Sequence, residues 1–90
     1  MEETNNKDVI FGIDIVINML ETATNVKFKL VNEFDKEYIS LGQISEQQLL
    51  DAGFEFTGYS SYVKCPVYQL GKNIEAVFNE TILHIYDLRG

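Results

Sequence analysis

The stretch FGIDIVINMLETATN, from Phe11 to Asn25, decides the fold class, because it can be read either as a strand or as a helix. Read as a strand, its apolar residues alternate with a second set that is itself half apolar, so the alternation is imperfect. Read as a helix, its polar residues form one stripe at helical spacing. The stripe consists of Asp14, Asn18, Glu21 and Asn25. The stripe and the length of the segment favour a helix, which we predict over residues 8–24.

The predicted helix has a wider apolar arc than one buried face needs. The residues opposite the polar stripe are Val9, Ile13, Val16, Leu20 and Ala23. The apolar residues that flank the stripe are Ile10, Phe11, Ile15 and Ile17. Together they exceed the roughly 100° arc that is typical of a surface helix. Two explanations stay open: the rest of the chain covers the arc, or a second copy of the protein does, with the four flanking residues as the self-association surface of a homodimer.

A β-hairpin is predicted after this helix. VKFKLV (26–31) alternates apolar and basic residues, as a half-buried strand does. EYISLG (37–42) follows a polar loop and is interpreted as the partner strand.

A short helix is predicted within SEQQLLDAG (45–53). Ser45 can cap its first turn, Gln48 stands at the capping-box position, and Gly53 can end it in a left-handed conformation. The residues expected on its buried face are Leu49 and Leu50.

The last third of the chain predicts a β-meander. Its strands lie within YVKCPVYQL (62–70), IEAVF (74–78) and ILHIYDL (82–88), which are separated by short polar turns. Pro66 lacks a backbone N–H group, which places its step on an edge strand or at a bulge.

A polar and aromatic loop, within GFEFTGYSSYVK (53–64), is predicted before the meander. Core packing accounts for Phe54 and Phe56. Tyr59 lies between a glycine and a serine, and we expect it to be exposed as an anchor for a protein partner.

These elements predict an α+β fold in a single domain, residues 1–90, with residues 1–7 as an untethered tail. The order is an N-terminal helix, then β-β-α-β-β-β, with an antiparallel sheet and the helices packed on one of its faces.

The charge of the chain is strongly acidic. Fourteen acidic residues against seven basic residues give a net charge of −7. This balance argues against direct binding of nucleic acid or of an anionic membrane, and it favours a basic protein partner. No signal peptide or membrane-spanning segment is visible, so we expect a cytoplasmic protein.

Catalytic chemistry has few candidates in this sequence. His84 and Cys65 could form a nucleophile–base pair, but Cys65 precedes a proline and has no helix N-terminus nearby to lower its pKa. One histidine and one cysteine are too few for a structural zinc site, and no calcium or phosphate-binding loop is present. We therefore expect no enzymatic activity, no cofactor and no metal.

The densest acidic cluster consists of Glu33, Asp35 and Glu37. If this segment is extended, the three carboxylates line one side at intervals of about 7 Å and can imitate the phosphates of a nucleic acid. The alternative is an ordinary solvated loop. We name these residues, with Tyr59, as candidate partner-binding residues.

In its small size, acidity, α+β organisation and lack of a catalytic constellation, the chain resembles phage-encoded inhibitors of bacterial defence such as anti-CRISPR proteins. It is also similar to bacterial immunity proteins that block toxic nucleases. The resemblance is one of general build over the whole chain, and it transfers no functional residues. It implies a non-enzymatic inhibitor that blocks a basic site on a nucleic-acid-processing enzyme or toxin in a bacterial cell. The alternative is an assembly protein that self-associates through the first helix.

Overall fold

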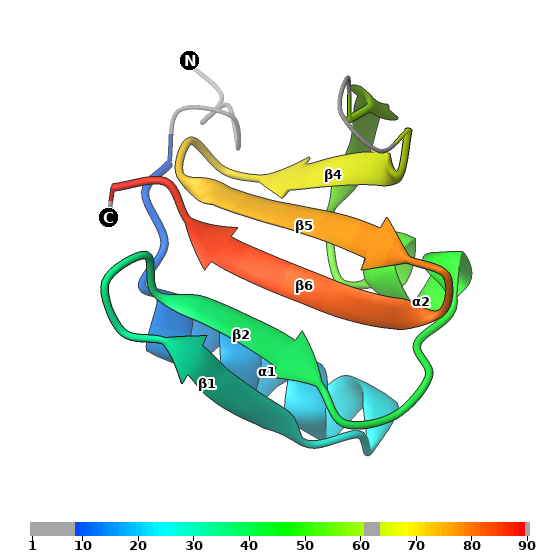
Figure 1. Cartoon of the computed structure of the whole chain (residues 1–90), viewed down its shortest axis with the longest axis horizontal. Helices are drawn as coiled ribbons and strands as arrows, with labels where there is room; N and C mark the ends of the chain where they lie inside the picture. Colours follow the sequence, from blue (N-terminus) through cyan, green and yellow to red (C-terminus); the bar gives the residue numbers. More distant parts are fainter. Residues whose placement is uncertain (1–8, 61–63, 90) are drawn as a thin grey trace, which may run out of the picture.

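A six-stranded antiparallel sheet forms the front of the molecule, and both helices lie behind it (Figure 1). The computed structural model describes residues 9–60 and 64–89, so the predicted tail, residues 1–7, lies outside the described residues. The elements are α1 (Ile13–Thr24), β1 (Phe28–Asn32), β2 (Glu37–Ser40), α2 (Glu46–Asp51), β3 (Glu55–Tyr59), β4 (Pro66–Leu70), β5 (Ile74–Asn79) and β6 (Ile82–Asp87). The strand order is β1-β2-β6-β5-β4-β3. The prediction of an α+β fold with an antiparallel sheet is confirmed.

The first helix begins at Ile13, later than the predicted start at residue 8. The segment before it is extended because its backbone bonds to the β4–β5 turn. The N–H of Lys72 donates to the carbonyl of Val9 at 2.7 Å. Gly71 in that turn has a φ of 64°, and a Cβ atom there would lie 2.5 Å from the Val9 carbonyl oxygen. A glycine is therefore required for this close approach.

The sheet covers most of the apolar arc of α1. Val16 and Leu20 are buried, and so is Ile17, which is only 6% exposed. The prediction of Ile17 as a self-association residue is therefore wrong, because its side chain belongs to the core. Phe11 is half-buried and packs against the same core, whereas Ile15 is 70% exposed.

The core lies between the helices and the inner face of the sheet. The inward side chains of β5 and β6 are fully or almost fully buried, and they pack against α1 and Leu49 of α2 in one cluster. They are Ile74, Ala76, Phe78, Leu83 and Ile85. The burial of side chains alternates strictly along these two strands, from Ile74 to Phe78 and from Ile82 to Asp87.

The predicted loop before the meander contains a strand, β3, which adds a sixth strand at the edge of the sheet. It pairs with β4 through a bulge between Phe56 and Gly58, and Gly58 has a φ of 144°. Phe56 was expected in the core but is 47% exposed, because only one neighbouring strand covers an edge position. Pro66 was predicted on an edge strand or at a bulge, but β4 lies between β5 and β3, and the bulge is between Phe56 and Gly58. Pro66 is instead the first residue of β4, a position where a missing N–H group is tolerated.

The second helix has the predicted capping box. The Ser45 side chain accepts from the Gln48 N–H, and the Gln48 side chain accepts from the Ser45 N–H. Leu49 is fully buried, but Leu50, also predicted as buried, is exposed.

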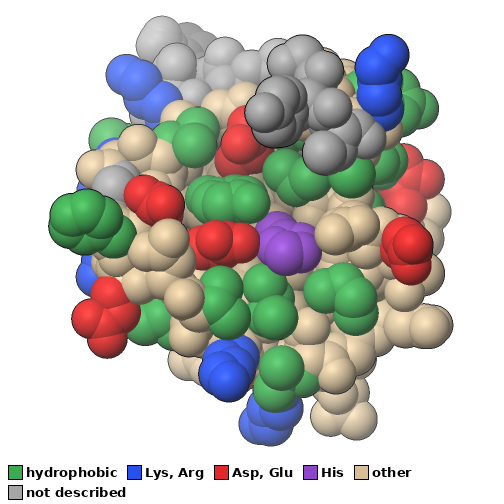
Figure 2. All heavy atoms as spheres, viewed as in Figure 1, with side chains coloured by type: hydrophobic (Ala, Val, Ile, Leu, Met, Phe, Trp, Pro, Cys, Tyr) green, Lys and Arg blue, Asp and Glu red, His purple; other side chains and the backbone are tan. Residues whose placement is uncertain are grey.

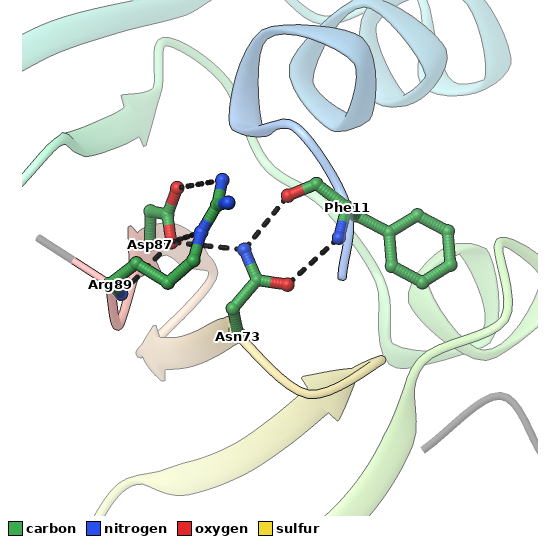
Figure 3. A network of polar contacts seen from close by, with 4 residues as sticks. All are labelled: Phe11, Asn73, Asp87 and Arg89. Carbon is green, nitrogen blue, oxygen red and sulfur yellow. Dashed lines mark hydrogen bonds and ion pairs between the residues drawn. The ribbon is translucent and has the colours of Figure 1, made fainter. Parts of the chain in front are cut away.

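One buried side chain ties together three distant parts of the chain (Figure 3). Asn73, 2% exposed, accepts from the Phe11 N–H at 2.9 Å and donates to the Phe11 carbonyl at 2.8 Å. It also donates to Asp87 at 2.9 Å, and Arg89 pairs with the same carboxylate at 3.2 Å. Burial alone raises the pKa of Asp87, but the hydrogen bonds from Arg89 and Asn73 outweigh it and lower the pKa below its ordinary value. Asn73 thus fixes the extended segment that precedes α1.

Candidate functional site

A groove of about 500 Å³ opens at the end of the sheet, where α2 begins and the β5–β6 turn closes the hairpin. Its walls come from α2, β3, β4, β5 and the β5–β6 turn. We call it the aromatic groove, and its principal residues are Glu46, Phe56, Tyr59, Tyr68, Phe78 and Glu80. In Figure 1 the start of α2 and the β5–β6 turn lie together on the right.

The four aromatic rings of the groove form a continuous edge-to-face series. Phe56 contacts Tyr59 and Tyr68, with ring centroids 5.4 Å and 5.5 Å apart. Tyr68 contacts Phe78 at 5.7 Å with an interplanar angle of 90°. Tyr68 and Phe78 are buried, whereas Phe56 and Tyr59 are exposed, so the series runs from the core to the surface. Such rings form a rigid apolar wall that loses little side-chain entropy on binding.

A short hydrogen bond fixes one carboxylate beside these rings. The Tyr68 hydroxyl donates to Oε2 of Glu46 at 2.6 Å. Burial, and then the bond to Glu46, raise the pKa of Tyr68 to about 12, so its hydroxyl remains a donor over the whole neutral range.

The second carboxylate of the groove belongs to Glu80, in the tight β5–β6 turn. Glu80 adopts a φ of 65°, and its side chain is exposed. Both charged residues that line the groove are glutamates. Neither forms an ion pair with another residue of the described ranges, 9–60 and 64–89. The groove therefore combines aromatic walls with uncompensated negative charge.

The acidic cluster predicted from sequence does not form a row. Residues 33–36 make a turn between β1 and β2, so the segment is not extended as the row requires. Asp35 is tied into this turn by Asn32, whose side chain donates to its carboxylate at 3.2 Å. Glu37 instead lies on β2, and its carboxylate is 3.0 Å from Nδ1 of His84.

Tyr59, the fourth candidate residue, lies far from these carboxylates in the sheet, since β3 and β1 are opposite edge strands. It is 65% exposed, as predicted. The structure thus places Tyr59 in the aromatic groove and does not bring it together with Glu33, Asp35 or Glu37.

The outer face of the sheet is not covered by α1 or α2 (Figure 1), and Figure 2 shows the side chains on this face. Hydrophobic and acidic side chains are interspersed on it around the single histidine. On this face the pKa of Tyr86 is raised, first by burial and second by the negative charge of Glu37. His84 lies on the same face as Ile82 and Tyr86, as alternation predicts, and its partner is Glu37.

The part of the chain that the structure describes holds neither a cluster of metal ligands nor a helix that could span a membrane. Within residues 9–60 and 64–89, no three His, Cys, Asp or Glu side chains gather closely enough to hold a metal ion. No helix of the described chain is long and apolar enough to cross a membrane.

Sequence reasoning identified Tyr59 but missed the rest of the groove. Phe54 is buried just before β3, whereas Phe56 within the strand is exposed, so no alternation of apolar and polar residues marks β3 in the sequence. No local signal linked Glu46 to Tyr68, because the contact spans 22 positions of the chain.

No family model matches the chain, and comparisons with curated proteins and with solved structures find no match.

Proposed function

We propose that this protein is a non-enzymatic binding module that inhibits a basic protein by covering its functional site. The observation that carries the proposal is the aromatic groove, which holds two glutamates and is part of a chain with net charge −7. Exposed aromatic residues next to uncompensated carboxylates suit a basic protein surface.

Binding by this module has two physical components. The negative field of the whole chain accelerates encounter with a basic partner. Glu33 and Asp35, in the β1–β2 turn, contribute to that field, and Phe56 and Tyr59 anchor the complex after contact.

The proposed target class is a nucleic-acid-processing enzyme or a toxic nuclease in the cytoplasm of a bacterial cell. Such enzymes hold the phosphate backbone with clustered Lys and Arg, so an acidic protein can occupy the same site. The inhibitor would then be of the phage anti-defence or immunity type.

The test is affinity capture from a bacterial lysate across a salt series, followed by an activity assay of the captured enzyme. We expect a basic nucleic-acid enzyme that is released as salt rises, and whose activity falls when the purified protein is added. Capture of an enzyme that stays fully active at saturating protein would contradict the inhibitor function.

Self-association through α1 is a second candidate function. Ile10, Ile15 and Met19 are exposed large hydrophobic residues on or just before this helix. A homodimer in light scattering that becomes monomeric in Ile15→Glu would support it. A monomeric wild-type protein at micromolar concentration would overturn it.

A further inference from the structure

We propose that the aromatic groove receives an arginine side chain of the partner, an inference that rests on the proposed function and names the group recognised. At about 500 Å³ the groove falls within the roughly 300–1,000 Å³ range of ligand-binding pockets. A side chain and the adjoining backbone of a partner loop can therefore occupy it.

The exposed rings supply the first part of this recognition. Phe56 and Tyr59 are 47% and 65% exposed, so part of each ring is accessible to a ligand. A guanidinium group binds to the face of an aromatic ring, which attracts cations through its quadrupole.

The glutamates supply the second part. The Tyr68 hydroxyl occupies Oε2 of Glu46 and holds the carboxylate in place. Oε1 of Glu46 and the carboxylate of Glu80 bond to no other described residue and are available to N–H donors. An apolar side chain in the groove would desolvate these charges without pairing them, which costs free energy.

These two features favour arginine over lysine. The guanidinium group is planar, weakly hydrated and able to stack on a ring while it donates two parallel hydrogen bonds to a carboxylate. A lysine ammonium group is a compact, strongly hydrated charge that gains less from an aromatic wall.

The experiment is a nuclear magnetic resonance titration of the whole protein with three capped tripeptides, Gly-X-Gly, in which X is arginine, lysine or citrulline. Citrulline has the shape of arginine without its charge. We expect the arginine peptide to shift the backbone signals of Tyr59 and Thr81 and to bind about tenfold more tightly than the citrulline peptide. The lysine peptide should be intermediate. Equal binding of the arginine and citrulline peptides, or shifts confined to the β1–β2 turn, would overturn the inference.

Two variants locate the binding in the groove. Glu80→Gln changes an exposed turn residue, and Glu46→Gln keeps an acceptor for the Tyr68 hydroxyl, so both should retain the wild-type spectrum outside the groove. Each should weaken the binding of the arginine peptide several-fold. Glu33→Gln in the β1–β2 turn should leave the affinity for this peptide unchanged. Loss of affinity in Glu33→Gln alone would place the binding elsewhere and overturn the inference.

The outcomes separate this inference from the proposed function. If the arginine peptide does not bind but a captured basic enzyme is inhibited and loses affinity in Tyr59→Ala, arginine recognition is wrong and the proposed function stands. If the peptide binds in the groove but no captured enzyme is inhibited, arginine recognition stands and the proposed function is wrong.

Discussion

The hydroxyl of Tyr68 on β4 donates a 2.6 Å hydrogen bond to the carboxylate of Glu46 at the start of α2. This bond connects the sheet to the helix and defines one wall of the aromatic groove. A mobile Glu46 side chain would have to be ordered on binding, so a carboxylate that is already held saves conformational entropy.

Tyr68→Phe removes this bond and keeps the ring. We expect a loss of about 1.5 kcal/mol in the free energy of unfolding, because a partly buried hydrogen bond to a charged group is lost. Urea denaturation measures it. Tyr59→Phe is the matched control, since the Tyr59 hydroxyl bonds to no other described residue, and its stability should stay within about 0.5 kcal/mol of wild type. Equal losses in the two variants would contradict this role of the bond.

Alkaline titration gives a second test of the same bond. Burial and the bond to Glu46 raise the pKa of Tyr68 from 10.0 to about 12. Because the folded pKa is the higher one, the stability gained is fully present below pH 10 and is lost as pH rises towards 12. The ultraviolet difference between wild type and Tyr68→Phe should show a phenol that ionises near pH 12. Ionisation near pH 10 in that difference spectrum would contradict both the burial of the Tyr68 hydroxyl and its bond to Glu46.

The Asn73 network predicts a sensitivity to acid. The pKa of Asp87 lies below its ordinary value of 3.8, so its contribution to stability is present above pH 3.8 and disappears as pH falls through the lowered value. Thermal unfolding across this range should therefore show a smaller acid-induced loss in Asp87→Asn than in wild type. An identical acid dependence of the two proteins would exclude this contribution.

Asn73→Ala breaks the network at its centre. We expect a loss of about 2–4 kcal/mol in the free energy of unfolding, because backbone groups of Phe11 and the Asp87 carboxylate lose buried partners. Asn79→Ala, at the exposed end of β5, is the matched control and should change stability by less than about 0.5 kcal/mol. Denaturation of both variants in urea measures the difference, and a neutral Asn73→Ala would show that the extended segment does not depend on this side chain.

Local patterns predicted the elements whose partners are also local. The polar stripe of α1, the β5–β6 hairpin and the capping box of Ser45 and Gln48 are all visible within a few residues. The start of α1 could not be predicted from local residues, because it is fixed by Asn73, which is 62 positions from Phe11.

The other differences between the predicted and the observed structure arise at an edge strand or between residues that are far apart in the sequence. β3 is exposed along most of its length, so the alternation that marks a half-buried strand is absent from it. The burial of Ile17 depends on which strands lie over α1, and the pairing of β2 with β6 brings together residues more than 40 positions apart. The aromatic groove was missed for the same reason, since its residues come from five separate elements.

The measurement that tests the central claim most directly is the affinity of the captured enzyme for two double variants. Tyr59→Ala/Glu80→Lys alters the groove, and Phe34→Ala/Glu33→Lys makes the same changes in the β1–β2 turn, where Phe34 is 87% exposed. Both variants change the net charge from −7 to −5, so the long-range attraction is matched. We expect the groove variant to bind at least about thirtyfold more weakly, from the loss of an aromatic anchor and a charge, and the turn variant to stay within about threefold of wild type. Equal losses in the two variants, or a larger loss in the turn variant, would contradict the groove as the binding site.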